Sequence, residues 1–97
     1  MVIHLTNRAL LKLSGSENKT FLQAQLSNDI SKIDDSSVQL NAYCQHQGKI
    51  LALFWVIRVG GDFLLSFPID LLDSIKARLQ MYVLMTDVKI TDVTEQY

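Results

Sequence analysis

The sequence predicts an α+β fold, in which two helices pack on one face of an antiparallel-rich sheet. Two stretches repeat apolar residues at helical spacing. Several shorter apolar runs, rich in β-branched and aromatic residues, lie between turn residues and have the character of strands. The expected order along the chain is β-β-α-β-β-β-α-β.

The length of 97 residues predicts a single domain, residues 1–97. The chain is 48% hydrophobic and 20% charged, which is typical of a folded protein. A net charge of −1 gives no electrostatic reason to expect nucleic acid or an anionic membrane as a partner. The longest apolar run, Ile50–Ile57, is far shorter than the roughly 20 residues that span a bilayer. The single cysteine, Cys44, fits a reducing compartment, so we expect a soluble cytoplasmic protein.

The first third of the chain predicts two strands and a helix. Val2–Leu5 and Ala9–Leu13 are short apolar runs separated by turn residues. Ser16 is expected to cap a helix over Glu17–Asn28 by accepting a backbone N–H from the first turn. The apolar stripe of this helix consists of Phe21, Leu22 and Leu26, and Ile30 extends it.

The middle of the chain predicts a loop and a hairpin. Ser27–Ser37 is polar and is expected to be a loop. Val38–Tyr43 alternates, which predicts a half-buried strand with Val38, Leu40 and Ala42 on its apolar side. After a turn at Gly48, the unbroken apolar run of Ile50–Arg58 predicts a strand that is covered on both faces.

The last third predicts a second hairpin, a helix and a final strand. Gly60–Asp62 closes the hairpin and Phe63–Phe67 returns. Asp70 is expected to cap a helix over Leu71–Val83 that buries Leu72, Ile75, Leu79 and Tyr82. Asp87–Val93 alternates as a last strand. The complete order resembles a ferredoxin-like layout with extra strands.

Cys44 is the one thiol that can act as a nucleophile, and His46 lies two residues away. The pair straddles a strand end and a turn, so we favour a buried or merely tolerated cysteine, because a free cysteine usually behaves as a small hydrophobe. Two histidines without a second cysteine make a metal site improbable. The adjacent Asp34 and Asp35 are expected to be solvated rather than catalytic.

Two other features allow ligand binding, each beside a simpler explanation. Gly48 and Lys49 can present a backbone N–H and a cation to an anion, or they can form an ordinary hairpin turn with an exposed lysine. Trp55, Phe54 and Phe67 can stack on a flat heterocycle, although aromatic side chains in strands more often form the core.

Three segments carry a resemblance to a known family, namely Leu13–Ile30, Leu40–Arg58 and Asp62–Ile90. They contain the patterns Ser-Gly-x₅-Phe-Leu-Gln-x-Gln-Leu and Cys-x₃-Gly-Lys in the family's order and spacing. In these patterns the chain resembles the N-terminal part of YgfZ-type folate-binding proteins, which are relatives of the glycine-cleavage T-protein, an aminomethyltransferase. The resemblance implies that C-terminal domains of a longer chain are missing, and that tetrahydrofolate is bound through Gln25, Gly48 and Lys49.

The departures from the family favour its YgfZ branch. The Lys-Gly-Cys motif of YgfZ proteins has no counterpart here, so Cys44 does not inherit the role of that cysteine. By register from Gly48, the Asp-Asp pair of the T-protein falls on Ala52 and Leu53, and its folate-contacting Asn falls near Pro68. Aliphatic side chains cannot serve the folate-linked transfer, so we do not expect an enzyme.

The resemblance therefore implies a tetrahydrofolate-binding segment with a role in iron–sulfur cluster maintenance and tRNA modification, not catalytic alone. The alternative is a non-catalytic interaction module that forms a homodimer through exposed sheet or helix faces. An active aminomethyltransferase is the least favoured hypothesis.

Overall fold

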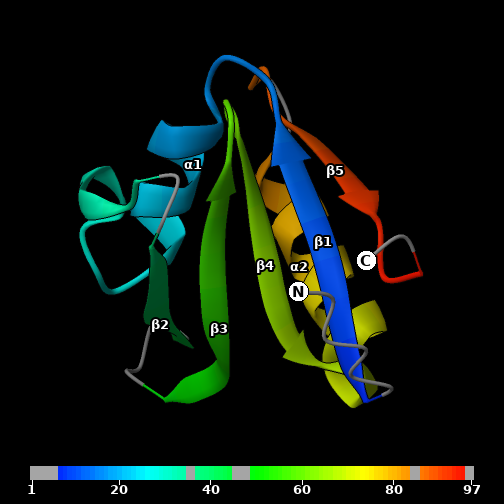
Figure 1. The fold of residues 1–97 in the computed structure, drawn as a ribbon. Helices are drawn as coiled ribbons and strands as arrows, with labels where there is room; N and C mark the ends of the chain where they lie inside the picture. Colours follow the sequence, from blue (N-terminus) through cyan, green and yellow to red (C-terminus); the bar gives the residue numbers. More distant parts are fainter. Residues whose placement is uncertain (1–6, 35–36, 45–48, 84–85, 96–97) are drawn as a thin grey trace.

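The structure, a computed structural model, describes residues 7–34, 37–44, 49–83 and 86–95. Within them it contains one antiparallel sheet of five strands and two α-helices (Figure 1). The strands are β1 (Arg8–Ser14), β2 (Val38–Cys44), β3 (Ile50–Val59), β4 (Asp62–Pro68) and β5 (Lys89–Asp92). The helices are α1 (Asn18–Gln25) and α2 (Leu72–Tyr82), and short 3₁₀ turns cover Ile30–Lys32 and Ile69–Leu71. The predicted fold class is confirmed, while the expected first strand Val2–Leu5 lies outside the described residues.

The strands are ordered β2-β3-β4-β1-β5, and each neighbouring pair is antiparallel. β1 lies between β4 and β5, with Leu11 opposite both Leu65 and Asp92. Its alternate residues Ala9, Leu11 and Leu13 are fully buried, because successive side chains of a strand point to opposite faces of the sheet. The last strand is shorter than the predicted Asp87–Val93, because only four residues pair with β1.

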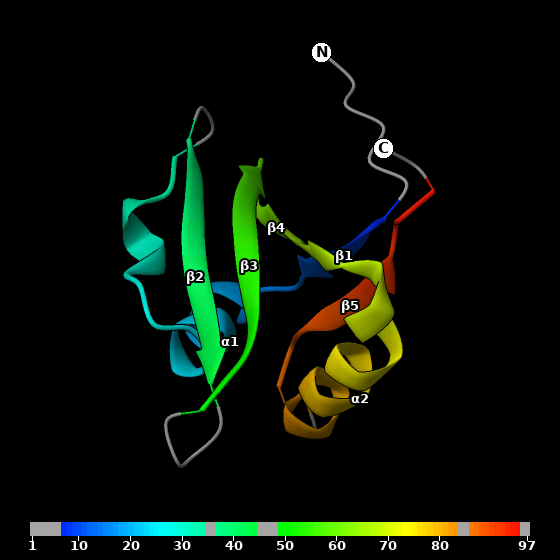
Figure 2. The same ribbon diagram turned by 90° about the horizontal axis from the view of Figure 1, so that it is seen from below.

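One face of the sheet carries the core and both helices. The register brings Leu11, Leu65 and Val56 onto this face, where they join Leu22 of α1 and Leu79 of α2 in one cluster of buried residues. In Figure 1 α2 lies behind β4 and β1, and in Figure 2 α1 lies behind β2 and β3. The predicted placement of both helices on one face is therefore correct.

The opposite face of β3 is open, so the prediction that this strand is covered on both faces is wrong. Ala52, Phe54 and Val56 are buried, but Leu53 is 49% exposed and Trp55 is 45% exposed. Both helices have packed on the other side of the sheet, and no described element covers the second row of apolar side chains.

The predicted orientation of β2 is reversed. Val38 and Leu40 are exposed, whereas Asn41 and Tyr43 are buried. The hairpin register sets this orientation, since it pairs Asn41 with the core residue Phe54. The buried amide is tolerated because its oxygen accepts from the Asn28 N–H at 2.8 Å and its nitrogen donates to Gln39 Oε1 at 2.9 Å.

The capping predictions for both helices are wrong. Ser16 does not cap α1; its N–H and hydroxyl both donate to Asp87 Oδ2, at 3.0 and 2.6 Å. Glu17 occupies the position before α1 and makes no side-chain cap. Asp70 lies within the 3₁₀ turn Ile69–Leu71, so α2 begins only after it, at Leu72.

Both helices are shorter than predicted. Leu26 leaves α1 with an extended backbone and forms a bridge with Tyr43, which ends the helix before the predicted Asn28. A 3₁₀ turn, Ile30–Lys32, interrupts the predicted loop Ser27–Ser37. In α2, Ile75 and Leu79 are buried as expected, but Tyr82 is 47% exposed.

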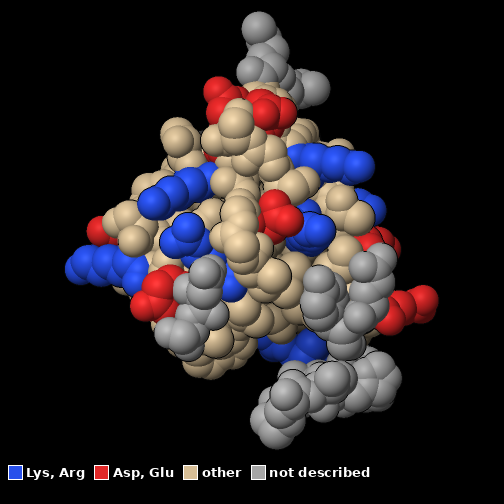
Figure 3. Space-filling view, turned by 45° about the horizontal axis from the view of Figure 1, so that its top comes forward, with Lys and Arg blue, Asp and Glu red and all other residues tan. Residues whose placement is uncertain are grey.

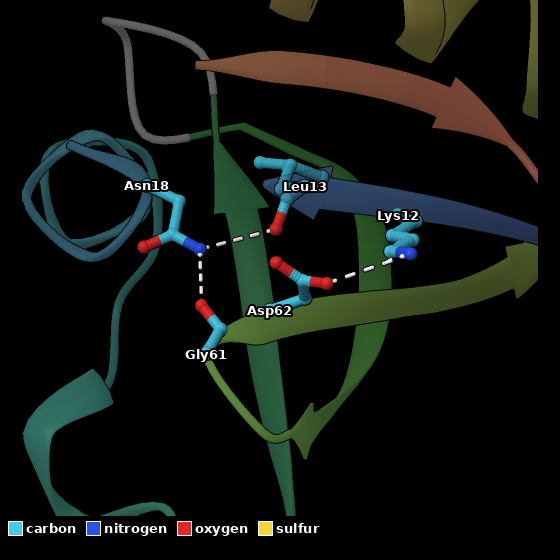
Figure 4. Close-up of polar contacts among 5 residues, drawn as sticks. All are labelled: Lys12, Leu13, Asn18, Gly61 and Asp62. Carbon is cyan, nitrogen blue, oxygen red and sulfur yellow. Dashed lines mark hydrogen bonds and ion pairs between the residues drawn. The ribbon is translucent and has the colours of Figure 1, made fainter. Parts of the chain in front are cut away.

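Asn18 joins three parts of the fold at the start of α1 (Figure 4). Its buried amide nitrogen donates to the carbonyl of Leu13 at 3.1 Å and to the carbonyl of Gly61 at 2.8 Å. Leu13 is the residue before the last of β1, and Gly61 lies in the turn between β3 and β4. Beside it, Lys12 and Asp62 form an ion pair with a distance of 3.5 Å between Nζ and Oδ2.

Candidate functional site

The predicted ligand contacts lie at one end of the β2–β3 hairpin. Leu26 forms a bridge with Tyr43, and the next residue, Cys44, pairs with Ile50. Gln25 precedes Leu26 and Lys49 precedes Ile50, so the pairing brings both to this end of the hairpin. Gln25 is half-buried and Lys49 is exposed. The third predicted contact, Gly48, lies outside the described residues.

Tyr43 is the buried polar group of this hairpin end. Its ring stacks on Phe54 with a centroid distance of 5.4 Å and an interplanar angle of 23°. Burial raises the pKa of Tyr43 above its ordinary value of 10.0, while the positive charge of Arg78 opposes this shift and Tyr82 adds to it. The phenol is therefore neutral at physiological pH, and its hydroxyl remains a hydrogen-bond donor.

Arg78 and Tyr82 bring the second half of α2 to the same region, since both act electrostatically on Tyr43. Sequence reasoning missed these three residues. The alternation of β2 placed Tyr43 on the solvent side, and nothing local in α2 shows that it approaches β2. We refer to these three residues, together with Gln25 and Lys49, as the hairpin-end cluster, a set of hydrogen-bond donors and cations assigned to this region from strand pairing and from the electrostatic effect on Tyr43. Its chemistry suits an anionic ligand.

Of the three aromatic residues proposed for stacking, only Trp55 is accessible. Phe54 and Phe67 are fully buried and lie against each other at a centroid distance of 5.2 Å, so they belong to the core. Trp55 projects from the open face of β3.

The predictions about thiol and metal chemistry fall partly outside the described residues, because His4 and His46 both lie there. Cys44 is exposed at the end of β2, and its predicted neighbour His46 lies outside the described residues. In the described ranges no group of three or more His, Cys, Asp or Glu side chains is arranged to hold a metal ion. Asp34 is exposed, and Asp35 lies outside these ranges.

A separate cavity of about 340 Å³ lies where α2 begins and β5 ends, lined by Ile69, Leu72, Asp92, Thr94 and Glu95. Asp92 Oδ1 accepts from the Thr94 hydroxyl at 2.6 Å and from its N–H at 3.0 Å, and these bonds lower the pKa of Asp92. This carboxylate therefore serves the local turn. None of the predicted contacts lines the cavity.

The surface charge is mixed. On the face shown in Figure 3, Lys and Arg side chains lie among Asp and Glu side chains without forming a large region of one sign. Neither helix of the described chain has the length and hydropathy of a membrane-spanning segment.

The two positions assigned to the T-protein's Asp-Asp pair lie on opposite faces of β3. Ala52 points into the core and Leu53 points out from the open face, 49% exposed. Pro68, at the position assigned to the folate-contacting Asn, is the exposed last residue of β4. Neither residue of β3 can accept a proton.

Comparisons with known proteins support the resemblance seen in the sequence, although no protein-family model matches the chain. The tRNA-modifying protein YgfZ of Colwellia psychrerythraea is 27% identical over 95 residues. An aminomethyltransferase of Exiguobacterium sibiricum is 36% identical over 88 residues. The chain is related to both YgfZ and the aminomethyltransferases.

The relationship extends over most of this chain and a minority of the relatives. The matches cover 98% and 90% of this chain, but only 29% of the YgfZ protein and 24% of the aminomethyltransferase. The fold agrees with the crystal structure of glycine cleavage system aminomethyltransferase T from Bartonella henselae, with a TM-score of 0.82 at 15% identity. This likeness covers 90% of this chain and 24% of that chain, and it establishes the fold alone.

Proposed function

We propose that this chain is a folate-binding segment of the YgfZ type, which forms part of the wall of a tetrahydrofolate site. The observation that carries the proposal is the match to a YgfZ protein across 98% of the chain. The relatives extend well beyond the matched region, so the complete site and the activity built on it belong to a longer protein.

The proposed folate contacts are Gln25, Gly48 and Lys49. The first and last lie in the hairpin-end cluster, which also contains Arg78. A folate carries carboxylates on its glutamate tail, and ammonium and guanidinium groups bind carboxylates through charge-assisted hydrogen bonds. The cluster therefore supports binding of the anionic end of the ligand.

The segment is proposed to be non-catalytic. An aminomethyl transfer needs a carboxylate at the reacting centre, and β3 offers Ala52 and Leu53 at the positions assigned to it. The related YgfZ proteins are named as tRNA-modifying. We therefore propose a cytoplasmic role in tRNA modification and iron–sulfur cluster maintenance, with the folate as bound cofactor.

Calorimetric titration of tetrahydrofolate into the full-length protein tests the binding. We expect saturable heat with one site, and a Lys49→Ala variant should bind about 10-fold more weakly, since one charge-assisted hydrogen bond is lost. Lys32→Ala is the control, because Lys32 is exposed in the 3₁₀ turn after α1 and lies outside the cluster. Absence of heat, together with absence of competition at high folate concentration, would exclude this function.

An interaction module is the second candidate function, and the open face of the sheet favours it. Four large apolar side chains, Val38, Leu40, Leu53 and Trp55, are between 42% and 54% exposed there. An exposed group of this kind marks an association surface more often than a solvated one.

A further inference from the structure

β2 is the first strand in the order β2-β3-β4-β1-β5, so no described strand pairs with its second edge. In an antiparallel pair, every second residue of a strand directs its N–H and C=O away from the partner strand. At a free edge these groups form a template on which a strand of another chain can pair. The seven residues of β2 include neither a charged side chain nor a proline, so the usual side-chain protection of an edge is absent from this strand.

Residues 26–29, which follow α1, lie along this free edge, and we call them the edge strap. Ser27 Oγ accepts from the N–H of Ala42 at 3.0 Å. The side-chain nitrogen of Asn28 donates to the carbonyl of Leu40 at 2.8 Å. Leu40 and Ala42 are two residues apart, as the outward-directed positions of one strand must be. The two bonds therefore occupy an acceptor and a donor that a further strand would use.

The edge strap follows β2 closely without being a strand itself. Its contacts advance in step, from the bridge of Leu26 with Tyr43 to the Asp29 carbonyl, which accepts from Gln39 Nε2 at 3.0 Å. In Figures 1 and 2 the chain that leaves α1 passes beside β2, on the side away from β3. Side chains thus take the place of most of the backbone bonds that a neighbouring strand would make.

Gln23 of α1 holds the edge strap from its other side. Its Nε2 donates to the Asn28 carbonyl at 2.8 Å, and its Oε1 accepts from the N–H of Ile30 at 2.8 Å. The N–H of Asn28 donates in turn to Oδ1 of the buried Asn41 at 2.8 Å. The strap is therefore bonded to α1 on one side and to β2 on the other, which fixes its position at the edge.

We propose that the edge strap is a conformational guard, which prevents β2 from pairing with the β2 of a second copy of this chain. With the strap in place, the Leu40 carbonyl and the Ala42 N–H are occupied. Without the bonds from Ser27 and Asn28, these groups belong to an uncharged edge that can extend into a continuous sheet across two copies. The proposal concerns the edge of β2 alone and is independent of folate binding.

Combining Ser27→Ala with Asn28→Ala tests the proposal, because the double variant removes both side-chain bonds and leaves the Leu26 bridge in place. Sedimentation velocity over a range of chain concentrations measures self-association. We expect the double variant to associate at least about 10-fold more tightly than the unmodified chain, since two backbone groups on each copy become available for pairing. Self-association equal to that of the unmodified chain would overturn the proposal.

Tryptophan fluorescence shows which surface the double variant uses. Trp55 is the single tryptophan of the sequence, and its side chain is 45% exposed on the open face of β3. Pairing of two β2 edges leaves that face uncovered, so the emission should stay unchanged while the copies associate. A shift of the emission to shorter wavelength with association would place the contact on the open face and overturn the proposal.

Two further variants separate the guard from a general loss of stability. Asn18→Ala removes buried hydrogen bonds far from β2 and should not increase self-association, although it destabilises the fold. Adding Leu40→Lys to the double variant places a charge in the middle of the edge strand, which should reverse the association. Association of Asn18→Ala to the same extent would overturn the proposal. So would persistent association of the triple variant, with its fold verified by circular dichroism.

Discussion

Two buried amides, Asn18 and Asn41, hold backbone groups that the regular structure leaves without partners. Asn18 serves the carbonyls of Leu13 and Gly61, and Asn41 serves the N–H of Asn28. Neither contact follows a local sequence pattern, because each joins segments between 5 and 43 residues apart. At the residue scale, the fold therefore depends on polar groups that composition would assign to the surface.

Replacement of Asn18 by alanine should lower the free energy of unfolding by about 2–3 kcal/mol. The variant loses two hydrogen bonds and leaves the Leu13 and Gly61 carbonyls without this donor in a buried region. Urea denaturation measures the change. Lys19→Ala, at an exposed neighbouring position of α1, should change stability by less than about 0.5 kcal/mol. Equal effects from the two variants would contradict the structural role of Asn18.

Acid should destabilise the protein through three hydrogen-bonded carboxylates. The side-chain and backbone bonds from Ser16 to Asp87, from Ser31 to Asp29 and from Thr94 to Asp92 lower the pKa of each aspartate below its ordinary value of 3.8. Because the folded state binds these protons less readily than the unfolded state, this stability is complete above about pH 4 and is lost as the pH falls through the lowered values.

Urea denaturation between pH 2.5 and pH 7 checks this dependence, which should be flat near neutrality and fall below about pH 4. Asp87→Asn should make the fall shallower, since it removes one of the three groups. Asp73→Asn, an equal charge change at an exposed position of α2, is the comparison. An acid response that Asp87→Asn leaves unchanged would refute the contribution of the Ser16 contact.

Gly15 lies between β1 and α1, at a position that admits no side chain. Its φ of +108° is unfavourable for other residues, and a Cβ atom would lie 2.2 Å from the carbonyl oxygen of Asp87. The same carbonyl accepts from the N–H of Glu17 at 3.2 Å. At the element scale, this close approach fixes the segment before β5 against the start of α1.

Gly15→Ala should therefore lower the free energy of unfolding by at least about 2 kcal/mol, since both the strained φ and the backbone clash must be relieved. Gly61→Ala is the matched control, because a Cβ atom at Gly61 meets nothing within 4 Å. Thermal unfolding followed by circular dichroism compares them. A Gly15→Ala variant as stable as Gly61→Ala would show that the segment before β5 can move aside without cost.

The strands also show where local sequence patterns fail to predict which face is buried. In β2 the predicted alternation selects the wrong side as the buried one. The residues of β2 are all uncharged, and its more hydrophobic side, with Val38 and Leu40, is the exposed one. Pairing with β3 decides the register, and the polar network around Asn41 makes that register acceptable.

At the scale of the whole molecule, both helices cover one face of the sheet, and the opposite face of β2 and β3 is open in the described residues. The second candidate function, an interaction module, would use this open face. If two copies associate through it, the midpoint of thermal unfolding should rise with chain concentration. A midpoint independent of concentration would argue against that candidate.

The candidate site was only partly predictable. The family patterns selected Gln25 and Lys49, and the pairing of Leu26 with Tyr43 and of Cys44 with Ile50 places them at one end of the hairpin. Their roles in folate binding remain predictions. Tyr43 and Arg78 were not predicted, because their proximity depends on how α2 crosses the sheet.

The sequence by itself determined the α+β class, the order of the elements within the described residues, and the relationship to YgfZ and the aminomethyltransferases. These follow from local periodicity and from residue patterns, which need no knowledge of distant contacts. The tertiary structure alone decided which face of β2 is buried, where α1 ends, and that the second face of β3 is open. Each of these depends on pairing between segments distant in sequence, and the free energy of that pairing outweighs the local preferences of the residues involved.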